Sequence, residues 1–511
     1  MYRLPMYRSK TIPLEKQRQA IKAAGPHEAF GWFMEMGTGK SKVTIDSCGK
    51  HFDRGDAKDV IIVCPNGLQR NWVEEFEKHC GAPYKMAFFE GNMKAEQRRE
   101  LEQLLRYNDP GVMRVLAISY EALRGNKGFD CAWDFMEGGR KFFVALDESQ
   151  RIKSTKRTAV QRDSVLAVGR RAEIRRILSG TSSPNSPLDL FSQFKFLDPA
   201  ILGYASITAF RAHYCVLMDP NSPQMRGLAN KIFGNPQRAK YMQIQQRDAD
   251  GQPVYKNLEE LSKRIAPFVF RARKDECLDL PPKVYAPRIT FDLSPKQRKI
   301  YDVIKRSIIA EFVHAGKLRR VDSALQLTRL GRLAAVCGNY FPDEDRKKPP
   351  IQIEPSKSNP RLLSVANWLE DGGDVSSIIW ARHTAEIDEL CEFYKGQCVR
   401  LDGSIKPEQR QINLKRFQAQ EHGARKLVAQ LSVGIGFDAY AASLVAYYTN
   451  SFNLEHRLQS EDRAHRKGLT HSVTYGDFEA LDTQDAKVIL ALRAKREISE
   501  VIAGDPITNW I

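Results

Sequence analysis

The chain has 511 residues, more than one hydrophobic core usually serves, so we expect two or more domains, each with its own core. Hydrophobic residues make up 42% of it, which is the composition of an ordinary soluble globular protein. The formal charge of +17 favours a polyanionic partner, because Lys and Arg that meet phosphates release condensed counterions. A charge that serves only solubility is the alternative.

Cysteine spacing and the N-terminus bear on the compartment. The nine cysteines show no C-x-x-C pair and no ordered framework, which predicts a reducing compartment, no zinc site and no disulfides. Residues 1–10 lack the apolar run of a signal peptide, and no later stretch is long enough to span a bilayer. We therefore expect a cytoplasmic protein without a membrane partner.

A helical pattern begins after Pro13 and contains Gln17. A glutamine a short distance before a phosphate loop can bind an adenine edge with its paired donor and acceptor. Gln17 is therefore a candidate nucleotide-binding residue, with an exposed helical glutamine that binds nothing as the alternative.

The stretch from Phe33 to Ser41 predicts a nucleotide-phosphate loop. Two glycines one residue apart let a backbone turn point several N–H groups inward, while the following Lys and a Mg²⁺ on the hydroxyl residue meet the β- and γ-phosphates. The full pattern asks for a glycine where Met34 stands, so a turn without a ligand is the alternative for this stretch alone. The predicted loop residues are Gly37, Thr38, Gly39, Lys40 and Ser41.

Short apolar runs at 60–64, 115–119 and 142–146 alternate with helical patterns. This alternation predicts an α/β domain that binds ligands at the carboxyl ends of its strands. The third run leads directly into Asp147 and Glu148, of which the first can hold Mg²⁺ and the second can polarise the attacking water. Such a pair is common in loops, so its place in the same domain as the phosphate loop carries the prediction.

A further strand pattern ends in the small hydroxyl residues of 177–185, and Phe196–Pro199 follows. The order of phosphate loop, Asp-Glu pair and this third segment resembles the Swi/Snf-like ATPases of helicase superfamily two. In that family the third segment couples the hydrolysis site to the nucleic-acid track.

The resemblance continues through the middle of the sequence. Residues 270–275, 280–283 and 292–298 look like the family's basic segment, its inter-lobe linker and the start of its second lobe. Residues 200–355 lack a regular strand rhythm and hold helical stretches rich in Arg and Lys, as at 317–332. The family places helical protrusions of both lobes here, beside a DNA duplex, and a solvated basic face is the alternative.

A second α/β pattern begins at 376 and includes apolar runs at 398–404, 426–432 and 443–449. The small residues from 432 to 436 would let the backbone approach a phosphate, of either the track or the nucleotide. Two lobes with the same rhythm suggest a duplicated nucleotide-binding fold.

The last segment, 459–468, begins with Gln459. Arg463 and Arg466 lie on one helical face, and a guanidinium supplied across a cleft can neutralise charge that develops on the γ-phosphate. Such a finger is typically worth about 10³ to 10⁵ in rate. A surface helix face is the alternative for this pair alone, but as the last of six ordered segments it matches the family's final motif.

The resemblance implies an α/β fold of two RecA-like parallel-sheet lobes with helical insertions between them. The expected domains are a first, ATP-binding lobe at 1–200, its helical protrusion with the linker at 201–283, a protrusion of the second lobe at 284–355, and the second lobe at 356–511. This lean form is similar to bacterial and bacteriophage members, which implies the cytoplasm of a bacterium or of an infected host.

The family's functional residues carry over onto matching positions. The resemblance implies catalytic roles for Lys40, Asp147, Glu148, Gln459, Arg463 and Arg466, and Mg²⁺ ligation by Ser41 and Asp147. It implies ATP contacts at Gln17, Gly37, Thr38, Gly39, Lys40, Ser41 and Gly436. It implies nucleic-acid contacts at Pro65, Asn66, Trp72, Ser119, Tyr120, Asn185, Arg382, Ser404 and Ser432.

Three positions depart from the family's pattern. Gln150 stands where His is usual, 452–454 read Phe-Asn-Leu instead of Trp-Asn-Pro, and Leu469 replaces a Gln. Gln150 can form hydrogen bonds but cannot titrate, so we expect the coupling step to be tuned differently. No phosphate, metal or water-activating group is lost, which predicts an active ATPase that uses ATP and Mg²⁺.

These features predict a motor that uses ATP to move along double-stranded DNA. A strand-separating helicase on forked or single-stranded DNA or on RNA is the alternative, because the same six segments serve both. The helical insertion and the linker argue for duplex translocation. A DNA-binding scaffold with a decayed ATPase is a remote third hypothesis, against which the intact catalytic residues count. The sequence names no recruiting protein partner.

Overall fold

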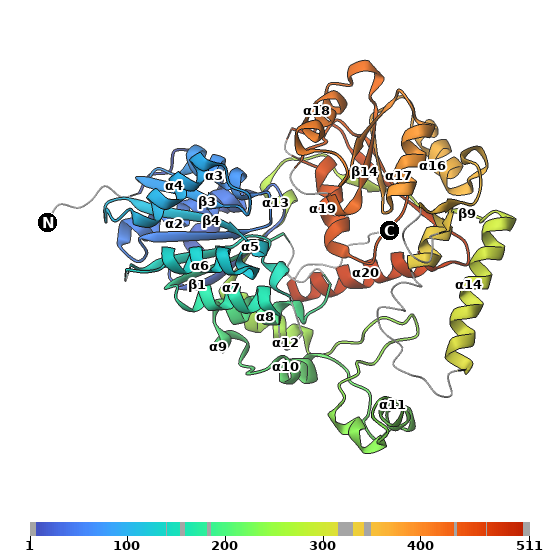
Figure 1. Cartoon of the computed structure of the whole chain (residues 1–511), viewed down its shortest axis with the longest axis horizontal. Coiled ribbons are helices and arrows are strands. Elements are labelled where there is room, and N and C mark those ends of the chain that lie inside the picture. The colour runs from blue at the N-terminus through green and yellow to red at the C-terminus, as the bar shows by residue number, and fades with distance from the viewer. Residues whose placement is uncertain are drawn as a thin grey trace. The chain divides into compact units, whose positions relative to one another are not determined.

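A computed structural model describes residues 7–138, 140–153, 159–180, 185–314, 331–341, 349–433, 437–466 and 468–503. The protein divides into two compact units. The first comprises Met1–Tyr214, Asn257–Asp279 and Ile498–Ile507, and the second comprises Cys215–Lys256, Leu280–Glu497 and Thr508–Ile511. Each unit contains its own parallel sheet with helices packed against it (Figure 1).

The first sheet has the order β3-β4-β2-β5-β6-β1-β7, and all its strand pairs are parallel. Its central strands consist of buried residues throughout, because helices cover both faces of the sheet (Figure 1). The strands are β1 (Ala29–Met34), β2 (Asp59–Cys64), β3 (Tyr84–Phe89), β4 (Met113–Ser119), β5 (Phe142–Leu146), β6 (Ile174–Ser179) and β7 (Val269–Ala272).

The helices of the first unit connect these strands. The longer ones are α1 (Glu15–Ala24), α2 (Lys40–Arg54), α3 (Gln69–His79), α4 (Ala95–Arg106), α6 (Asn126–Phe135), α7 (Val160–Arg170), α8 (Asp189–Leu197), α10 (Ile207–Tyr214) and α12 (Leu258–Ile265). The shorter ones are α5 (Tyr120–Arg124), α9 (Pro199–Leu202) and α13 (Lys274–Cys277).

The register of the first sheet brings three strand ends to one edge. Phe33 near the end of β1 pairs with Ser179 at the end of β6, and Leu146 at the end of β5 pairs with Ile177 of β6. The residues that follow β1, β5 and β6 therefore leave the sheet at the same carboxyl edge, where ligands bind in open parallel sheets.

The second sheet has the order β13-β14-β12-β15-β16-β8, with β9 pairing with β16, and it is also parallel. Its strands are β8 (Lys283–Tyr285), β9 (Ile289–Phe291), β12 (Ser377–Ala381), β13 (Cys398–Leu401), β14 (Lys426–Gln430), β15 (Leu444–Tyr447) and β16 (Val473–Ala480). The α-helices that the structure describes in this unit are α11 (Pro223–Phe233), α14 (Pro295–His314), α16 (Pro360–Asp371), α17 (Thr384–Phe393), α18 (Pro407–Gln418), α19 (Leu454–Ala464) and α20 (Gln484–Ala503) as far as Glu497. The two parallel sheets confirm the predicted α/β class.

Residues 201–355 differ from the sequence expectation in one respect. Besides helices, this stretch supplies β7 to the first sheet, β8 and β9 to the second, and an antiparallel pair of β10 (Tyr340–Phe341) and β11 (Ile351–Gln352). These strands have two to four residues each, too few to show the alternation by which strands are recognised in sequence.

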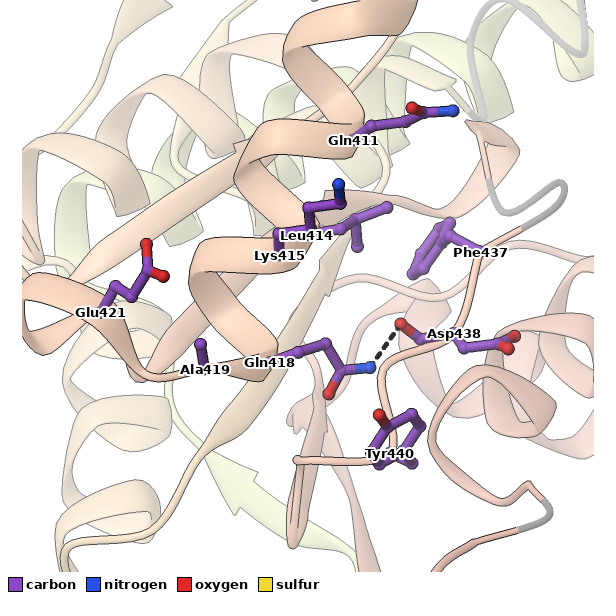
Figure 2. A pocket seen from close by; sticks show the side chains of 9 residues that line it. All are labelled: Gln411, Leu414, Lys415, Gln418, Ala419, Glu421, Phe437, Asp438 and Tyr440. Atoms are coloured by element: carbon purple, nitrogen blue, oxygen red, sulfur yellow. Dashed lines mark hydrogen bonds between the residues drawn. The ribbon is translucent and has the colours of Figure 1, made fainter.

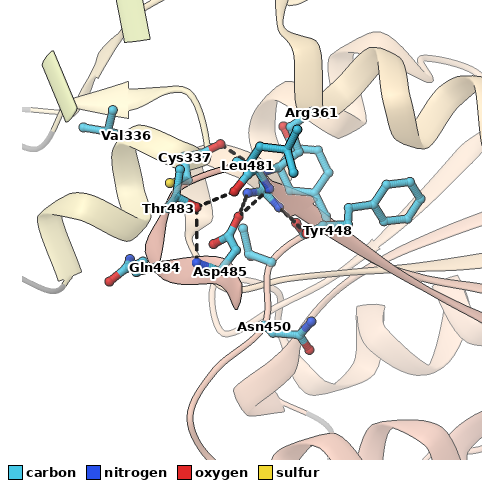
Figure 3. A network of polar contacts seen from close by, with 12 residues as sticks. Val336, Cys337, Arg361, Tyr448, Asn450, Leu481, Thr483, Gln484 and Asp485 are labelled. Atoms are coloured by element: carbon cyan, nitrogen blue, oxygen red, sulfur yellow. Dashed lines mark hydrogen bonds and ion pairs between the residues drawn. The ribbon is translucent and has the colours of Figure 1, made fainter. Parts of the chain in front are cut away.

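A buried arginine joins several elements of the second unit. Arg361 on α16 is 1% exposed, and its guanidinium donates to the C=O groups of Cys337, Tyr448 and Phe478 at 2.9, 2.6 and 3.1 Å and forms an ion pair with Asp485 (Figure 3). Because Nε, Nη1 and Nη2 of Arg361 each donate to an acceptor, the buried charge is compensated. This network fixes α16, the ends of β15 and β16 and the start of α20 to one another.

Among the described residues, no helix combines the length and apolar character that crossing a bilayer requires.

The Arg361 network gives a prediction for stability. Arg361→Met leaves the Asp485 carboxylate without its cation, which for a buried pair costs about 3–5 kcal/mol. Amide hydrogen exchange of β15 and β16, followed by mass spectrometry, should accelerate by about 100-fold or more. Lys395→Met, which breaks an ion pair of the exposed Lys395 with the exposed Glu392 in the same unit, is the control and should change exchange little. Equal acceleration in both variants would contradict this account of the network.

Candidate functional site

The phosphate loop connects β1 to α2, which begins at Lys40. Gly37 and Gly39 have φ values of +83° and +91°, a left-handed backbone that glycine adopts without strain. The N–H and Oγ1 of Thr38 donate to the C=O of Glu35 at 3.3 and 2.7 Å and close the turn. The first N–H groups of α2 and its dipole then favour an anion at this point.

Gln17 on α1 forms a hydrogen bond with the backbone of the phosphate loop. Its Oε1 accepts from the N–H of Leu14 at 2.9 Å, and its Nε2 donates to the C=O of Thr38 at 3.0 Å. A Cβ on Gly39 would lie 2.2 Å from this Nε2, so the close approach also requires glycine. The alternative of an exposed glutamine is wrong, because Gln17 is 7% exposed. Its contact with adenine stays a prediction.

The ammonium of Lys40 lies at the centre of the carboxyl edge. Its Nζ donates to the C=O of Met34 at 2.9 Å, and a Cβ on Gly180, just beyond β6, would lie 3.8 Å from it. Burial and the neighbouring Glu148 raise the pKa of Asp147 to about 6, and Lys40 acts in the opposite direction. The structure therefore brings the loop lysine and the first carboxylate of the Asp-Glu pair together, as the sequence predicts.

Glu148 is connected to the end of β6 through Gln150. The backbone of Glu148 is left-handed, with φ of +49°, and its Oε2 accepts from Nε2 of Gln150 at 2.7 Å. Oε1 of Gln150 accepts from Oγ of Ser179 at 2.9 Å, and both residues are buried. Gln150, which stands where the family usually has His, therefore connects the Asp-Glu pair to the third segment through an uncharged side chain. Of that segment, 181–184 lie outside the described residues, and Asn185 is partly buried.

The donor groups at this edge fit a magnesium nucleotide. The hydroxyl of Ser41 and the carboxylate of Asp147 are hard oxygen ligands, and Mg²⁺ usually takes one or two protein ligands together with phosphates and waters. Within the described ranges, no group of three or more His, Cys, Asp and Glu side chains is arranged to hold a metal. The residues present therefore suit an ion that a nucleotide brings with it.

Lys274 lies beside the loop, a contact that the sequence did not predict. β7 pairs with β1 so that Ala272 lies opposite Met34, which brings the residues after β7 to the same edge. The N–H of Lys274 donates to Oε2 of Glu35 at 2.8 Å, its side chain is buried, and its Cε would lie 3.9 Å from a Cβ on Gly37. Only the basic character of 270–275 hinted at it, because the contact depends on strand pairing across the unit.

The predicted nucleic-acid contacts of the first unit follow β2 and β4, which are neighbours. Asn66 is exposed at this edge, whereas Pro65 is buried. Ser119 is 3% exposed, and its Oγ caps α5 by accepting from the N–H of Ala122 at 3.1 Å. Asn66 is therefore the one of these three whose side chain faces solvent.

Trp72 and Tyr120 are both buried and point inward, and their contact with nucleic acid stays a prediction. Nε1 of Trp72 donates to Oδ2 of Asp147 at 3.1 Å, and the hydroxyl of Tyr120 donates to the C=O of Asp147 at 2.7 Å. The resemblance marks a segment, while the rotation of a helix about its axis decides which residue of the segment faces the core.

The second unit has a comparable carboxyl edge. Arg382, Ser404 and Ser432 follow β12, β13 and β14, which are adjacent strands. Arg382 is partly buried, and its N–H donates to Oγ1 of Thr449 at 2.8 Å. Ser404 and Ser432 are exposed. The structure thus gathers these predicted nucleic-acid residues at one edge, while Gly436, a predicted nucleotide contact, lies outside the described residues.

The two arginines of α19 and its C-terminal turn differ in exposure. Arg463 is 2% exposed, and its Nη1 donates to the C=O of Phe437 at 3.2 Å. Arg466 is partly exposed, and it pairs with Asp438 and donates from Nε to the C=O of Asp462 at 3.2 Å. Arg466 is therefore the arginine of this pair that can reach a ligand by changing one surface ion pair. Gln459 is partly buried and donates to Oε1 of Glu455 at 3.5 Å.

Residues that the sequence did not single out hold α19 in place. Arg457 is 2% exposed and donates to Glu461 at 2.9 Å and to Oδ2 of Asp477 at 2.9 Å. Lys283, from the linker segment, binds Oε2 of Glu461 at 3.1 Å. Burial alone would raise the pKa of Glu461, but Lys283 and Arg457 lower it to about 2. The linker thus anchors the helix that carries the family's final motif.

A pocket of about 630 Å³ lies between α18 and the loop that carries Asp438 (Figure 2). Gln418 spans it: Nε2 donates to the C=O of Asp438 at 2.7 Å, and Oε1 accepts from the N–H of Ala441 at 3.1 Å. The same loop therefore contacts both Gln418, through two hydrogen bonds, and Arg466, through an ion pair. The residues that line the pocket are Gln411, Leu414, Lys415, Gln418, Ala419, Glu421, Phe437, Asp438 and Tyr440.

Two family profiles match the sequence. A profile described as SNF2-related domain covers residues 32–339, and one described as Helicase conserved C-terminal domain covers residues 360–468. All the predicted site residues except Gln17 fall within these ranges.

Several known proteins are similar to this one. It is 24% identical over 447 residues to Chromodomain-helicase-DNA-binding protein 1-like of Danio rerio, covering 86% of this sequence and 38% of that protein. It is 23% identical over 496 residues to an uncharacterized ATP-dependent helicase of Mycoplasma genitalium, covering 94% and 41%. It thus spans about two fifths of the length of these relatives. The SWI2/SNF2 ATPase core of Sulfolobus solfataricus in complex with dsDNA aligns over 99% of this protein and 96% of that one, at 18% identity and a TM-score of 0.40.

The Gln150 link gives a prediction for hydrolysis. Gln150→Leu removes the donor to Glu148 and the acceptor of Ser179, and loss of such an orienting partner typically lowers activity about 10- to 100-fold. Steady-state hydrolysis should show the loss in kcat, while binding of a fluorescent ATP analogue stays close to that of the wild type. Ser149→Ala, which removes the 2.7 Å bond from the same turn to Gln193, is the control and should preserve kcat. A wild-type kcat for Gln150→Leu would show that the link has no part in hydrolysis.

Proposed function

The protein belongs to the SNF2-related family of helicase-superfamily ATPases, and from that premise we propose that it is a motor that moves along double-stranded DNA. The observation that carries the proposal is the gathering of the phosphate loop, the Asp-Glu pair and the Gln150 link at one sheet edge, which is the arrangement needed to couple ATP hydrolysis to a second event. A formal charge of +17 supports a polyanionic track.

In this proposal the first unit binds and activates ATP. The N–H groups of the loop and Lys40 hold the phosphates, and Ser41 and Asp147 would hold Mg²⁺, which neutralises charge on the phosphates when bound. Glu148 orients the attacking water and takes up a proton from that water. The hydrogen bond from Gln150 holds the Glu148 carboxylate in place for this role, just beyond the end of β5.

The second unit would supply Arg466 to the γ-phosphate. Its partial exposure and its surface ion pair with Asp438 on a loop support that role. Arg463 is assigned a positioning role in place of direct contact, because it is buried and holds Phe437. Asn66, Ser404 and Ser432 are exposed at the two sheet edges, which supports contacts with the backbone of the track.

Duplex translocation is favoured over strand separation by family membership. The SNF2-related profile covers residues 32–339 and so includes the linker at 280–283 and most of the helical insertion, on which the argument for duplex translocation rests. The strand-separating helicase on forked or single-stranded DNA or on RNA remains the second candidate, and the next measurement distinguishes the two.

Displacement of a third strand tests translocation directly. With a duplex that carries a bound triplex-forming strand, the protein should release that strand in ATP and not in ADP, since only a moving motor reaches it. Lys40→Ala, which lacks the cation that holds the phosphates, should release none. Separation of the two duplex strands at a fork, without triplex release on a plain duplex, would favour the helicase.

Arg466→Ala tests the composite ATP site. Binding of a fluorescent ATP analogue should stay within a few fold of the wild type, while kcat should fall by about 10³ or more, because a finger acts on charge that develops in the transition state. Arg425→Ala, which breaks a surface ion pair with Asp374 in the same unit, is the matched control and should retain kcat. Turnover of Arg466→Ala at the wild-type rate would rule out this site.

A further inference from the structure

Asp147 is held by two aromatic residues that have no role in the hydrolysis mechanism proposed above. The carboxylate accepts from the indole N–H of Trp72 at 3.1 Å, and the backbone carbonyl oxygen accepts from the hydroxyl of Tyr120 at 2.7 Å. Trp72 is 3% exposed and Tyr120 is fully buried, so water does not compete for either bond. Together they fix both the side chain and the backbone of a single metal-binding residue.

The two bonds act on different parts of Asp147. An N–H donated to Oδ2 restricts rotation of the carboxyl group, to which the backbone of Glu148 also donates a hydrogen bond. The bond to the backbone oxygen instead fixes the peptide that joins Asp147 to Glu148, whose backbone is left-handed. The aromatic pair therefore controls the geometry of both carboxylates.

Trp72 and Tyr120 also belong to the two helices that follow the carboxyl edge of the sheet. Trp72 lies one turn into α3, which follows the exposed Asn66 and Gly67 after β2. Tyr120 is the first residue of α5, whose Glu121 binds Arg151 at 3.0 Å, just beyond Gln150. If the loop that precedes α3 or α5 moves and shifts its helix, the hydrogen bond from Trp72 or Tyr120 would displace Asp147.

We propose that Trp72 and Tyr120 are positioning residues that orient Asp147 for Mg²⁺, and that they transmit contact of duplex DNA with the loop at 65–68 and with α5 to the metal site. The transmission of DNA contact rests on the proposed function. The positioning role stands on the contacts of Asp147 alone and is tested without DNA.

The positioning role is tested by nucleotide binding. The affinity for a fluorescent ADP analogue is measured by anisotropy, once with excess chelator and once over a range of Mg²⁺ concentrations. Trp72→Phe keeps an aromatic side chain but removes the five-membered ring that carries the N–H, and it should raise the half-saturating Mg²⁺ concentration by about tenfold, within the range typical for loss of an orienting partner. The affinity in chelator is the internal reference, so a general folding defect would lower both affinities and leave their ratio unchanged.

The transmission role is tested by linkage. If plain duplex DNA tightens Mg²⁺–nucleotide binding by some factor, the nucleotide tightens DNA binding by the same factor. In Trp72→Phe and Tyr120→Phe this factor should approach one, even where each ligand still binds. Trp133→Phe and Tyr107→Phe make the same substitutions away from the Asp-Glu pair and should keep the wild-type factor.

The outcomes separate the two roles. An unchanged Mg²⁺ requirement in Trp72→Phe overturns the proposal. A raised Mg²⁺ requirement with an unchanged DNA factor keeps the positioning role and overturns transmission. If duplex DNA changes neither the nucleotide affinity nor the hydrolysis rate of the wild-type protein, that result contradicts the proposed function and the transmission role. The Mg²⁺ titration still decides the positioning role.

Discussion

The parallel register of β1, β6 and β5 is the constraint on which the proposed nucleotide site depends. Because Phe33 pairs with Ser179 and Leu146 with Ile177, the phosphate loop, the Asp-Glu pair and the start of the third segment leave the sheet at one edge. Residues far apart in sequence thereby surround the ammonium of Lys40. A slip of one residue in either pairing would turn the strand residues to the opposite face and shift these loops against one another.

Buried polar bonds then determine the orientation of the reactive groups. Asp147 is held by Trp72 and Tyr120, and Glu148 by Gln150, all through donors that are shielded from water. The second unit uses the same device with charged groups, since Arg361 and Arg457 are buried and satisfied by carboxylates and carbonyls. Rigid supports of this kind suit the proposed motor, because small shifts in one element reach the groups proposed to contact the nucleotide.

Much of this could be predicted from sequence, for reasons that differ by residue. The phosphate loop and the two sheets were predictable because glycine spacing and short apolar runs that alternate with helical patterns reflect local backbone requirements. The short strands β7, β8 and β9 were not, since three or four residues carry no period. Neither the contact of Lys274 with the loop nor the inward orientation of Trp72 could be predicted from local sequence, because both follow from strand pairing and helix rotation in the folded unit. Gln150 was recognised as a departure, but its partners Glu148 and Ser179 became evident only in three dimensions.

The central claim is that duplex DNA drives the ATPase cycle of this protein. Steady-state ATP hydrolysis by the purified protein, alone and with plain duplex, single-stranded DNA, forked DNA or RNA at two salt concentrations, tests it most directly. The account predicts strong stimulation by plain duplex that weakens as salt rises, because phosphate contacts release counterions. Stimulation by single strands or RNA alone, or hydrolysis that no nucleic acid changes, would contradict it.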